Sequence, residues 1–247
     1  MARFLARALR QRGQVDTSRE CLTHVPTTGG ADWLVDDDGR CWRLFLFVPG
    51  TRSLERPASA HEAREAARAY GAFLQLLTEY DGPPLHRTLH RFHDTAWRFE
   101  CLEQAASADP CGRLASCRLE VGALLEAADL ARALSLHPGP GVPERIVHND
   151  ARLANLLFDE RAARALCVVD LDTVMPGTAL YDFGDLVRSA ATTAPEDAED
   201  PGQVEANEEL FEALVQGYLE TAGTVLTQSE RALLATAGRI LTLEQAA

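Results

Sequence analysis

IVHNDARLANLLFD, at residues 146–159, is the stretch of sequence that decides the fold around it. An apolar run leads into His148 and Asp150, and Asn155 follows five residues after the aspartate, which matches the catalytic-loop pattern H-x-D-x-x-x-x-N. A carboxylate at Asp150 could orient an acceptor hydroxyl and take its proton. The amide of Asn155 offers a hard oxygen of the kind that Mg²⁺ prefers. The pattern therefore predicts Asp150 as a catalytic base and Asn155 as a metal ligand.

A second carboxylate can be placed beside Asn155 by strand pairing. If a five-residue turn follows Asp159, that residue faces Ala165 and Asn155 faces Val169 across a β-hairpin. Asp170 then emerges next to Asn155, with the two Cα atoms roughly 5–6 Å apart. Two oxygen ligands on adjacent strand ends could share one Mg²⁺, so Asp170 is predicted as the second metal ligand.

A competing candidate for the metal ligand is Asp182, because residues 182–184 spell D-F-G, the metal-binding triplet of protein kinases. Asp182 lies 27 residues after Asn155, at an expected helix start, whereas Asp170 lies 15 residues after Asn155. We therefore assign Asp170 to the metal. Asp182 is interpreted as a helix cap or as a carboxylate that supports the loop.

Three neighbouring side chains have two interpretations each. Arg152 could neutralise a transferring phosphoryl group and so help to bind the nucleotide, or it could pair with a local carboxylate. Asp172 could contact the acceptor substrate or a second metal, or it could be structural. His148 is expected to orient the loop from a partly buried position rather than to act as a base.

The charge and composition exclude several other functions. The net charge is −13, the pI is about 5.0 and no basic cluster is present, so we expect no nucleic-acid partner. All 24 basic residues are Arg. A P-loop of the form G-x-x-x-x-G-K-[ST] and mechanisms that form a Schiff base on lysine, including those of PLP, are therefore excluded.

The six cysteines form no C-x-x-C pair, which favours a reduced, cytoplasmic protein. The first twelve residues contain too many arginines for a signal peptide. No apolar stretch approaches the roughly 20 residues that cross a bilayer, so no membrane association is expected.

Periodicity and turn residues predict a mixed α+β chain in two lobes. An Asp-Gly turn between apolar runs predicts a β-hairpin at 33–47, and a linker follows near residue 50. Residues 1–50 are thus expected to form a partial N-terminal lobe, and residues 51–247 a mostly helical lobe with a small β-hairpin at the active site. An acidic loop is expected at 195–202. The predicted helices are 3–11, 61–80, 95–106, 113–136, 181–191, 205–222 and 227–246, and the predicted strands of the second lobe are 145–148, 155–159 and 165–170.

Taken together, these motifs resemble the aminoglycoside phosphotransferase superfamily, and within it the N-acetylhexosamine 1-kinases are the most similar group. The string at 168–177 is quite specific, and the resemblance spans nearly the whole chain. The motifs that carry it are HND at 148–150 with Asn155, VVDLDTVMPG at 168–177, YDFGD at 181–185, CWRLFLF at 41–47 and FHDT at 92–95.

This resemblance implies a protein-kinase-like fold that transfers the γ-phosphoryl group of ATP to the anomeric hydroxyl of a sugar, with Mg²⁺. Asp150 matches the base of the family, and Asn155 and Asp170 match its metal ligands. The segment Leu44–Pro49, which contains Phe47, matches the strand and hinge beside the adenine pocket. The expected partner is accordingly a small sugar or amino sugar.

Two departures from the family pattern matter. No Gly-rich loop precedes residue 33, and the strand lysine that grips nucleotide phosphates is missing. Judged by the family, the chain is expected to be truncated at both ends. A non-catalytic, kinase-like remnant that binds nucleotide weakly therefore remains an alternative, as does a metal-dependent hydrolase that uses the same Asp, Asn and Asp.

Overall fold

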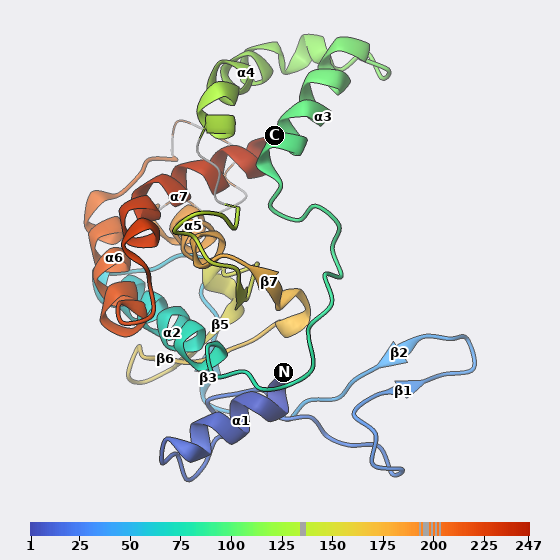
Figure 1. Cartoon of the computed structure of the whole chain (residues 1–247), viewed down its shortest axis with the longest axis vertical. Coiled ribbons are helices and arrows are strands. Elements are labelled where there is room, and N and C mark those ends of the chain that lie inside the picture. The colour runs from blue at the N-terminus through green and yellow to red at the C-terminus, as the bar shows by residue number, and fades with distance from the viewer. Residues whose placement is uncertain (134–136, 193, 195–197, 199, 201, 203) are drawn as a thin grey trace.

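The computed structural model describes residues 1–247 except 134–136, 193, 195–197, 199, 201 and 203 (Figure 1). Most of the predicted acidic loop at 195–202 therefore lies outside the described residues. Among the residues that are described, no helix is long and apolar enough to cross a membrane. The helices are α1 Ala2–Gln11, α2 Ala60–Leu77, α3 Thr95–Ala108, α4 Arg118–Ala133, α5 Ala179–Ala190, α6 Glu208–Ala222 and α7 Gln228–Ala246.

Two pairs of packed helices, α2 with α6 and α5 with α7, form the centre of the helical part of the molecule (Figure 1). The α2–α6 pair is close because Gly217 faces α2: a Cβ on Gly217 would lie 2.2 Å from the Arg64 carbonyl oxygen. Helix α2 begins after Ser59, whose hydroxyl accepts a hydrogen bond from the backbone N–H of Glu62. Its buried residues, among them Tyr70, Phe73 and Leu74, belong to the main hydrophobic core.

Helices α3 and α4 pack together at the end of the molecule where the C-terminus lies (Figure 1). The sequence predicts one helix over 113–136, but the structure has a 3₁₀ turn at Leu114–Ser116 and α4 begins only at Arg118. Between them Cys117 has non-helical backbone angles, with φ −131° and ψ 23°, so the single-helix prediction is wrong at its start.

In the part of the chain that the structure describes, the strands are short and form three antiparallel sheets. The central sheet has the order β3-β5-β6, and a second sheet pairs β4 with β7. Leu156 pairs with Val168, and the Val169 N–H donates to the Asn155 carbonyl at 3.0 Å, so the predicted register is confirmed at this end of the hairpin. The strands are β1 Leu34–Val35, β2 Cys41–Trp42, β3 Thr51–Arg52, β4 Arg145–Val147, β5 Leu156–Asp159, β6 Ala165–Val168 and β7 Met175–Gly177.

The register prediction is wrong at the turn end of the same hairpin. A bulge after Leu157 makes Phe158, rather than Asp159, the partner of Ala165. The Asp159 side chain stabilises the turn, because its Oδ1 accepts hydrogen bonds from the backbone N–H groups of Arg161 and Ala162.

The β1–β2 hairpin projects from the body of the molecule (Figure 1). The predicted second strand, 41–47, is reduced to Cys41–Trp42, and Phe45 forms an isolated bridge with His24 instead. Asp36 fixes the turn, since its carboxylate accepts hydrogen bonds from the backbone of Arg40 and from the Trp42 indole. Except for Phe45, the large apolar side chains of this region are about half exposed or more: Trp33, Leu34, Val35, Trp42, Leu44, Leu46 and Phe47.

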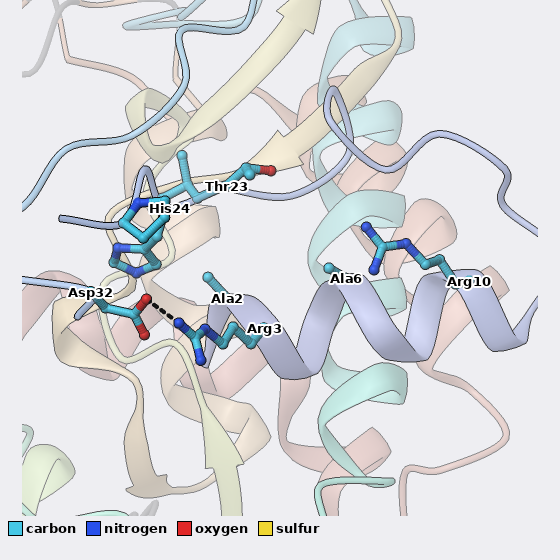
Figure 2. A pocket seen from close by; sticks show the side chains of 9 residues that line it. Ala2, Arg3, Ala6, Arg10, Thr23, His24 and Asp32 are labelled. Carbon is cyan, nitrogen blue, oxygen red and sulfur yellow. Dashed lines mark hydrogen bonds and ion pairs between the residues drawn. The ribbon is translucent and has the colours of Figure 1, made fainter. Parts of the chain in front are cut away.

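Helix α1 is tied to the segment that leads into this hairpin. Arg3 of α1 forms an ion pair with Asp32, beside His24, on one wall of a pocket of about 310 Å³ (Figure 2). The described side chains that line the pocket all come from the first 32 residues. The division of the chain into lobes at residue 50 remains a prediction.

Candidate active site

The catalytic-loop segment is anchored by the buried carboxylate of Asp182, which is 1% exposed. Its Oδ2 accepts a hydrogen bond from the His148 N–H at 2.9 Å, and its Oδ1 accepts one from the Asn149 N–H at 2.7 Å. Burial raises the pKa of Asp182, against the opposing influence of His148 and these two N–H groups. Thr178, not Asp182, occupies the N-cap position of α5. Of the two interpretations of Asp182, the structure therefore matches support of the loop.

His148 lies inside the loop with its ring in the core. Its Nε2 is 2.9 Å from the Val169 carbonyl oxygen, and its Nδ1 accepts the Asp150 N–H at 3.3 Å. This arrangement assigns a neutral ring that carries its proton on Nε2. The ring packs edge-on against Tyr70, with the two centroids 5.7 Å apart. These contacts favour the orienting role predicted for His148.

Asn149 has a left-handed backbone with φ 66°, and its side chain ties the loop to the start of β7. Its Nδ2 donates to the carbonyl oxygens of Thr173 at 3.1 Å and Met175 at 3.2 Å. Gly177 of β7 faces the same side chain, and a Cβ there would lie 2.6 Å from Asn149 Oδ1 and 2.7 Å from Val147 Cγ2. The loop and β7 can be this close because residue 177 has no side chain.

Gly177→Ala is therefore expected to destabilise the protein by about 1–3 kcal/mol, since the added methyl group must displace Asn149 or Val147. Urea unfolding would measure the change. Gly122→Ala in α4 is the matched control, because nothing lies within 4 Å of a Cβ there. Alanine favours helix more than glycine does, so this control should be neutral or stabilising. Equal destabilisation by the two variants would contradict the account of Gly177.

Asp150 is held by two neighbouring side chains. Arg152 Nε lies 2.8 Å from Oδ1 and Arg152 Nη2 lies 3.3 Å from Oδ2, while Asn155 Nδ2 donates to Oδ2 at 2.8 Å. The Asp150 side chain remains 23% exposed. The carboxylate is thus fixed in direction and open to a ligand. Arg152 pairs with the Asp150 carboxylate, as one of its two interpretations predicts. Its contact with a phosphoryl group remains a prediction.

The two predicted metal ligands lie at adjacent ends of the hairpin but outside the regular strands. Asn155 ends a 3₁₀ turn, Leu153–Asn155, and Asp170 has a left-handed backbone with φ 55°, so the predicted strands 155–159 and 165–170 are each too long. Both amide hydrogens of Asn155 are taken up by Asp150, which leaves Oδ1 as its remaining polar atom. Among the described residues, no hydrogen bond or ion pair engages the exposed Asp170 carboxylate.

These two oxygens suit Mg²⁺, which commonly binds one or two protein oxygen ligands together with phosphate oxygens and water. Among the described residues, no three or more His, Cys, Asp or Glu side chains lie together so that they could hold a metal ion. The donors present therefore fit a magnesium ion that is bound together with nucleotide phosphates.

Asp172 forms an ion pair with an arginine, whereas Phe47 is exposed to solvent. Asp172 is bound by Arg43 through two hydrogen bonds of 2.7 and 2.6 Å, which lower the pKa of the carboxyl group. This pair links the N-terminal segment to the 3₁₀ turn Leu171–Thr173, which follows β6. Phe47 is 84% exposed, and the structure does not bring it against Asp150 or Asp170 through any described contact. The substrate role of Asp172 and the nucleotide role of Phe47 remain predictions.

Sequence reasoning did not assign a role to His93 or Glu244, although both are buried against the loop. His93 Nε2 is 2.7 Å from the Asn149 carbonyl oxygen, and His93 Nδ1 is 2.8 Å from Glu244 Oε1. The contact joins residues 151 positions apart, so no spacing in the sequence could have indicated it.

A comparison with protein families matches residues 5–223 to the model described as the phosphotransferase enzyme family. Among solved structures, a microcompartment-associated aminopropanol kinase is similar, with a TM-score of 0.60, 22% identity, and coverage of 98% of this chain and 71% of that one. A choline/ethanolamine kinase family protein from Mesorhizobium loti has a TM-score of 0.55 and 17% identity, over 99% of this chain and 66% of that one.

An AMP-bound spectinomycin phosphotransferase has a TM-score of 0.56 and 11% identity, over 98% of this chain and 72% of that one. At these identities the likeness shows the fold, and it confirms the predicted α+β, kinase-like architecture. The chain spans about two thirds to three quarters of the length of these structures. Because the family model covers most of the sequence, the chain belongs to the phosphotransferase enzyme family.

Proposed function

We propose that the protein transfers the γ-phosphoryl group of ATP to a hydroxyl of a small molecule, and that this acceptor is a sugar or an amino sugar. One observation carries the proposal: the Asp150 carboxylate is directed by Asn155 and Arg152 and remains partly exposed at the end of an anchored loop. Membership of the phosphotransferase enzyme family supports the same reaction class.

The residues divide the chemistry among them. Asp150 would orient the acceptor hydroxyl and accept its proton as the new O–P bond forms. Asn155 and Asp170 would hold Mg²⁺, which neutralises phosphate charge when it is bound with ATP. Arg152, already beside Asp150, could turn toward the transferred group and offset its charge. Asp182 and His148 would keep the loop in place throughout.

Three considerations bear on the acceptor: the sequence resemblance, the similar solved structures and the net charge of the chain. The sequence resemblance favours an N-acetylhexosamine. The similar structures are described as aminopropanol, choline/ethanolamine family and spectinomycin enzymes, and their acceptors also carry nitrogen. A net charge of −13 favours cationic over anionic small molecules near the surface. An amino sugar fits all three considerations, and an amino alcohol fits the last two.

A second candidate is a nucleotide-binding protein with little or no turnover. It is favoured by the absence of lysine, because a chain without lysine lacks the phosphate-gripping residue on which positioning in this reaction depends. Loss of that contact should cost several kcal/mol of transition-state stabilisation.

Release of ADP separates the two candidates. The purified protein would be mixed with Mg-ATP and a panel of N-acetylhexosamines, hexoses, aminoglycosides and amino alcohols. Acceptor-dependent ADP supports phosphotransfer. A rise in Tm with Mg-ATP but no ADP from any acceptor supports the binding protein. Hydrolysis of phosphoesters without ATP would contradict both and indicate a metal-dependent hydrolase.

A further inference from the structure

A buried ion pair connects the C-terminal part of α7 to the loop that carries Asp150. His93 precedes α3 and is 3% exposed, and Glu244 of α7 is 2% exposed. His93 Nδ1 lies 2.8 Å from Glu244 Oε1, and His93 Nε2 lies 2.7 Å from the carbonyl oxygen of Asn149. We refer to His93, Glu244 and the Asn149 carbonyl as the His93 clasp.

Both ring nitrogens of His93 face acceptors. A carbonyl oxygen can only accept, so Nε2 must carry a proton. A carboxylate likewise only accepts, so Nδ1 must carry one as well. The arrangement therefore describes an imidazolium, unlike His148, whose Nδ1 accepts a hydrogen bond from the Asp150 N–H.

The surroundings support a charged pair. Glu244 Oε2 accepts a hydrogen bond from Thr95 Oγ1 at 2.6 Å, and Arg98 Nε lies 3.4 Å from Oε1. Burial acts to lower the pKa of His93, but Glu244, the Asn149 carbonyl and the more distant Asp185 together raise it. Burial acts to raise the pKa of Glu244, but His93, Thr95 and Arg98 together lower it.

The other elements around His93 contribute aromatic rings and one further acid. The ring of Tyr181 in α5 lies 4.8 Å from the His93 ring, centroid to centroid, and the ring of Phe92 lies 4.3 Å away. Asp182, also in α5, is influenced by the charge of His93. The His93 imidazolium is thus influenced by acids of two helices, Asp182 and Asp185 of α5 and Glu244 of α7. The basic side chain near the Glu244 carboxylate is Arg98.

The clasp and His148 hold opposite ends of one peptide unit. The carbonyl oxygen of Asn149 is bound by His93, and the N–H of the next residue, Asp150, is bound by His148. Because a peptide unit is planar, fixing its oxygen and its hydrogen fixes the plane from which the Asp150 side chain departs. Asn149 has φ 66°, which a non-glycine residue adopts at a cost unless neighbouring contacts hold it there.

We propose that His93, held as an imidazolium by Glu244, is a positioning residue that sets the direction of the Asp150 carboxylate through the Asn149–Asp150 peptide. The assignment of Asp150 as the reacting group rests on the proposed function. The ordering of the Asn149–Asp150 peptide by His93 does not depend on the proposed function.

Loss of the second proton breaks the clasp. A neutral imidazole has one N–H for two acceptors, so either Glu244 or the Asn149 carbonyl loses its donor. Because the pKa of His93 is raised in the folded protein, the stabilisation is fully present below the unfolded value, about 6.5. It is then lost as the pH rises through the folded value. Loop order and catalysis should therefore decline together as the pH rises through that folded value.

His93→Gln tests the positioning role, since glutamine donates hydrogen bonds from a single nitrogen and cannot carry charge. With ADP release as the assay, kcat and kcat/KM should fall together by up to roughly 100-fold, as expected for a misplaced catalytic group. The decline with rising pH that is due to His93 should disappear from the pH profile. His61→Gln, at an exposed position in α2, is the matched control and should leave both parameters unchanged.

Two measurements decide the inference without turnover. The imidazole of His93 in the unaltered protein, titrated by NMR, should show a pKa above 6.5. Hydrogen exchange at the Asp150 amide should accelerate in His93→Gln and in Glu244→Gln but not in His61→Gln. A His93 pKa at or below 6.5, or unchanged exchange at Asp150, would overturn the proposal. If His93→Gln does not fold, Glu244→Gln and the titration decide; absence of ADP from every acceptor would count against the proposed function alone.

Discussion

Asp150→Asn is expected to reduce acceptor-dependent ADP release by about 10²–10⁴-fold, the usual contribution of a general base. Asparagine has nearly the same shape, so Asn155 can still donate to its oxygen. It cannot take a proton, however, and its amide hydrogens would face Arg152 in place of a carboxylate oxygen. The loss should appear mainly in kcat, because Asp150 is not among the proposed metal ligands and Mg-ATP should still bind.

Initial rates of ADP release at saturating acceptor measure this effect, and a Tm shift with Mg-ATP verifies nucleotide binding in the variant. Asp81→Asn is a suitable control, since Asp81 pairs with Arg7 on the surface, far from the loop in sequence. Retention of more than a tenth of the original rate by Asp150→Asn would mean that another group takes the proton.

Glu230→Ala is expected to lower the free energy of unfolding by about 3–5 kcal/mol, because it leaves Arg145 without its partner in a largely buried position. Glu230 is fully buried and binds Arg145 through two hydrogen bonds of 2.8 and 2.9 Å. Its Oε2 also accepts the backbone N–H of Thr227, which completes the capping box of α7. Against a typical total of 5–15 kcal/mol, this loss is large.

Urea unfolding followed by circular dichroism measures the change. Glu79→Ala is the matched control, since it breaks a 2.6 Å ion pair with Arg12 in which both side chains are at least one third exposed. That pair should contribute less than about 1 kcal/mol. Replacing both members of the buried pair, with Arg145→Met and Glu230→Leu, should recover part of the stability. Similar losses in Glu230→Ala and Glu79→Ala would refute this explanation.

The sequence was sufficient to predict features that depend on local patterns. The helical periods located α2, α5 and α7 to within a few residues, and the apolar strands at 145–147 and 165–168 placed the loop and the hairpin. The pairing of Asn155 with Val169 followed from counting residues across a turn, because strand partners have a fixed period.

Features that depend on single backbone angles or on distant contacts could not be predicted in this way. The bulge after Leu157 and the left-handed angles at Asn149 and Asp170 leave no periodic signal. The His93–Glu244 contact depends on how α7 packs against the start of α3, and pairing across 151 residues has no pattern in one sequence. The sequence thus predicted the candidate reactive residues, but it did not predict the side chains that hold them in position.

The projecting β1–β2 hairpin also gives the protein an internal optical reporter. Two of the three tryptophans, Trp33 and Trp42, lie there with more than half of their surface exposed, while Trp97 lies in α3 at the other end of the molecule. Two of the three indole emitters are therefore in contact with water. Any molecule that covers the hairpin should shift the emission to shorter wavelength, whereas a ligand confined to the Asp150 loop should leave it nearly unchanged.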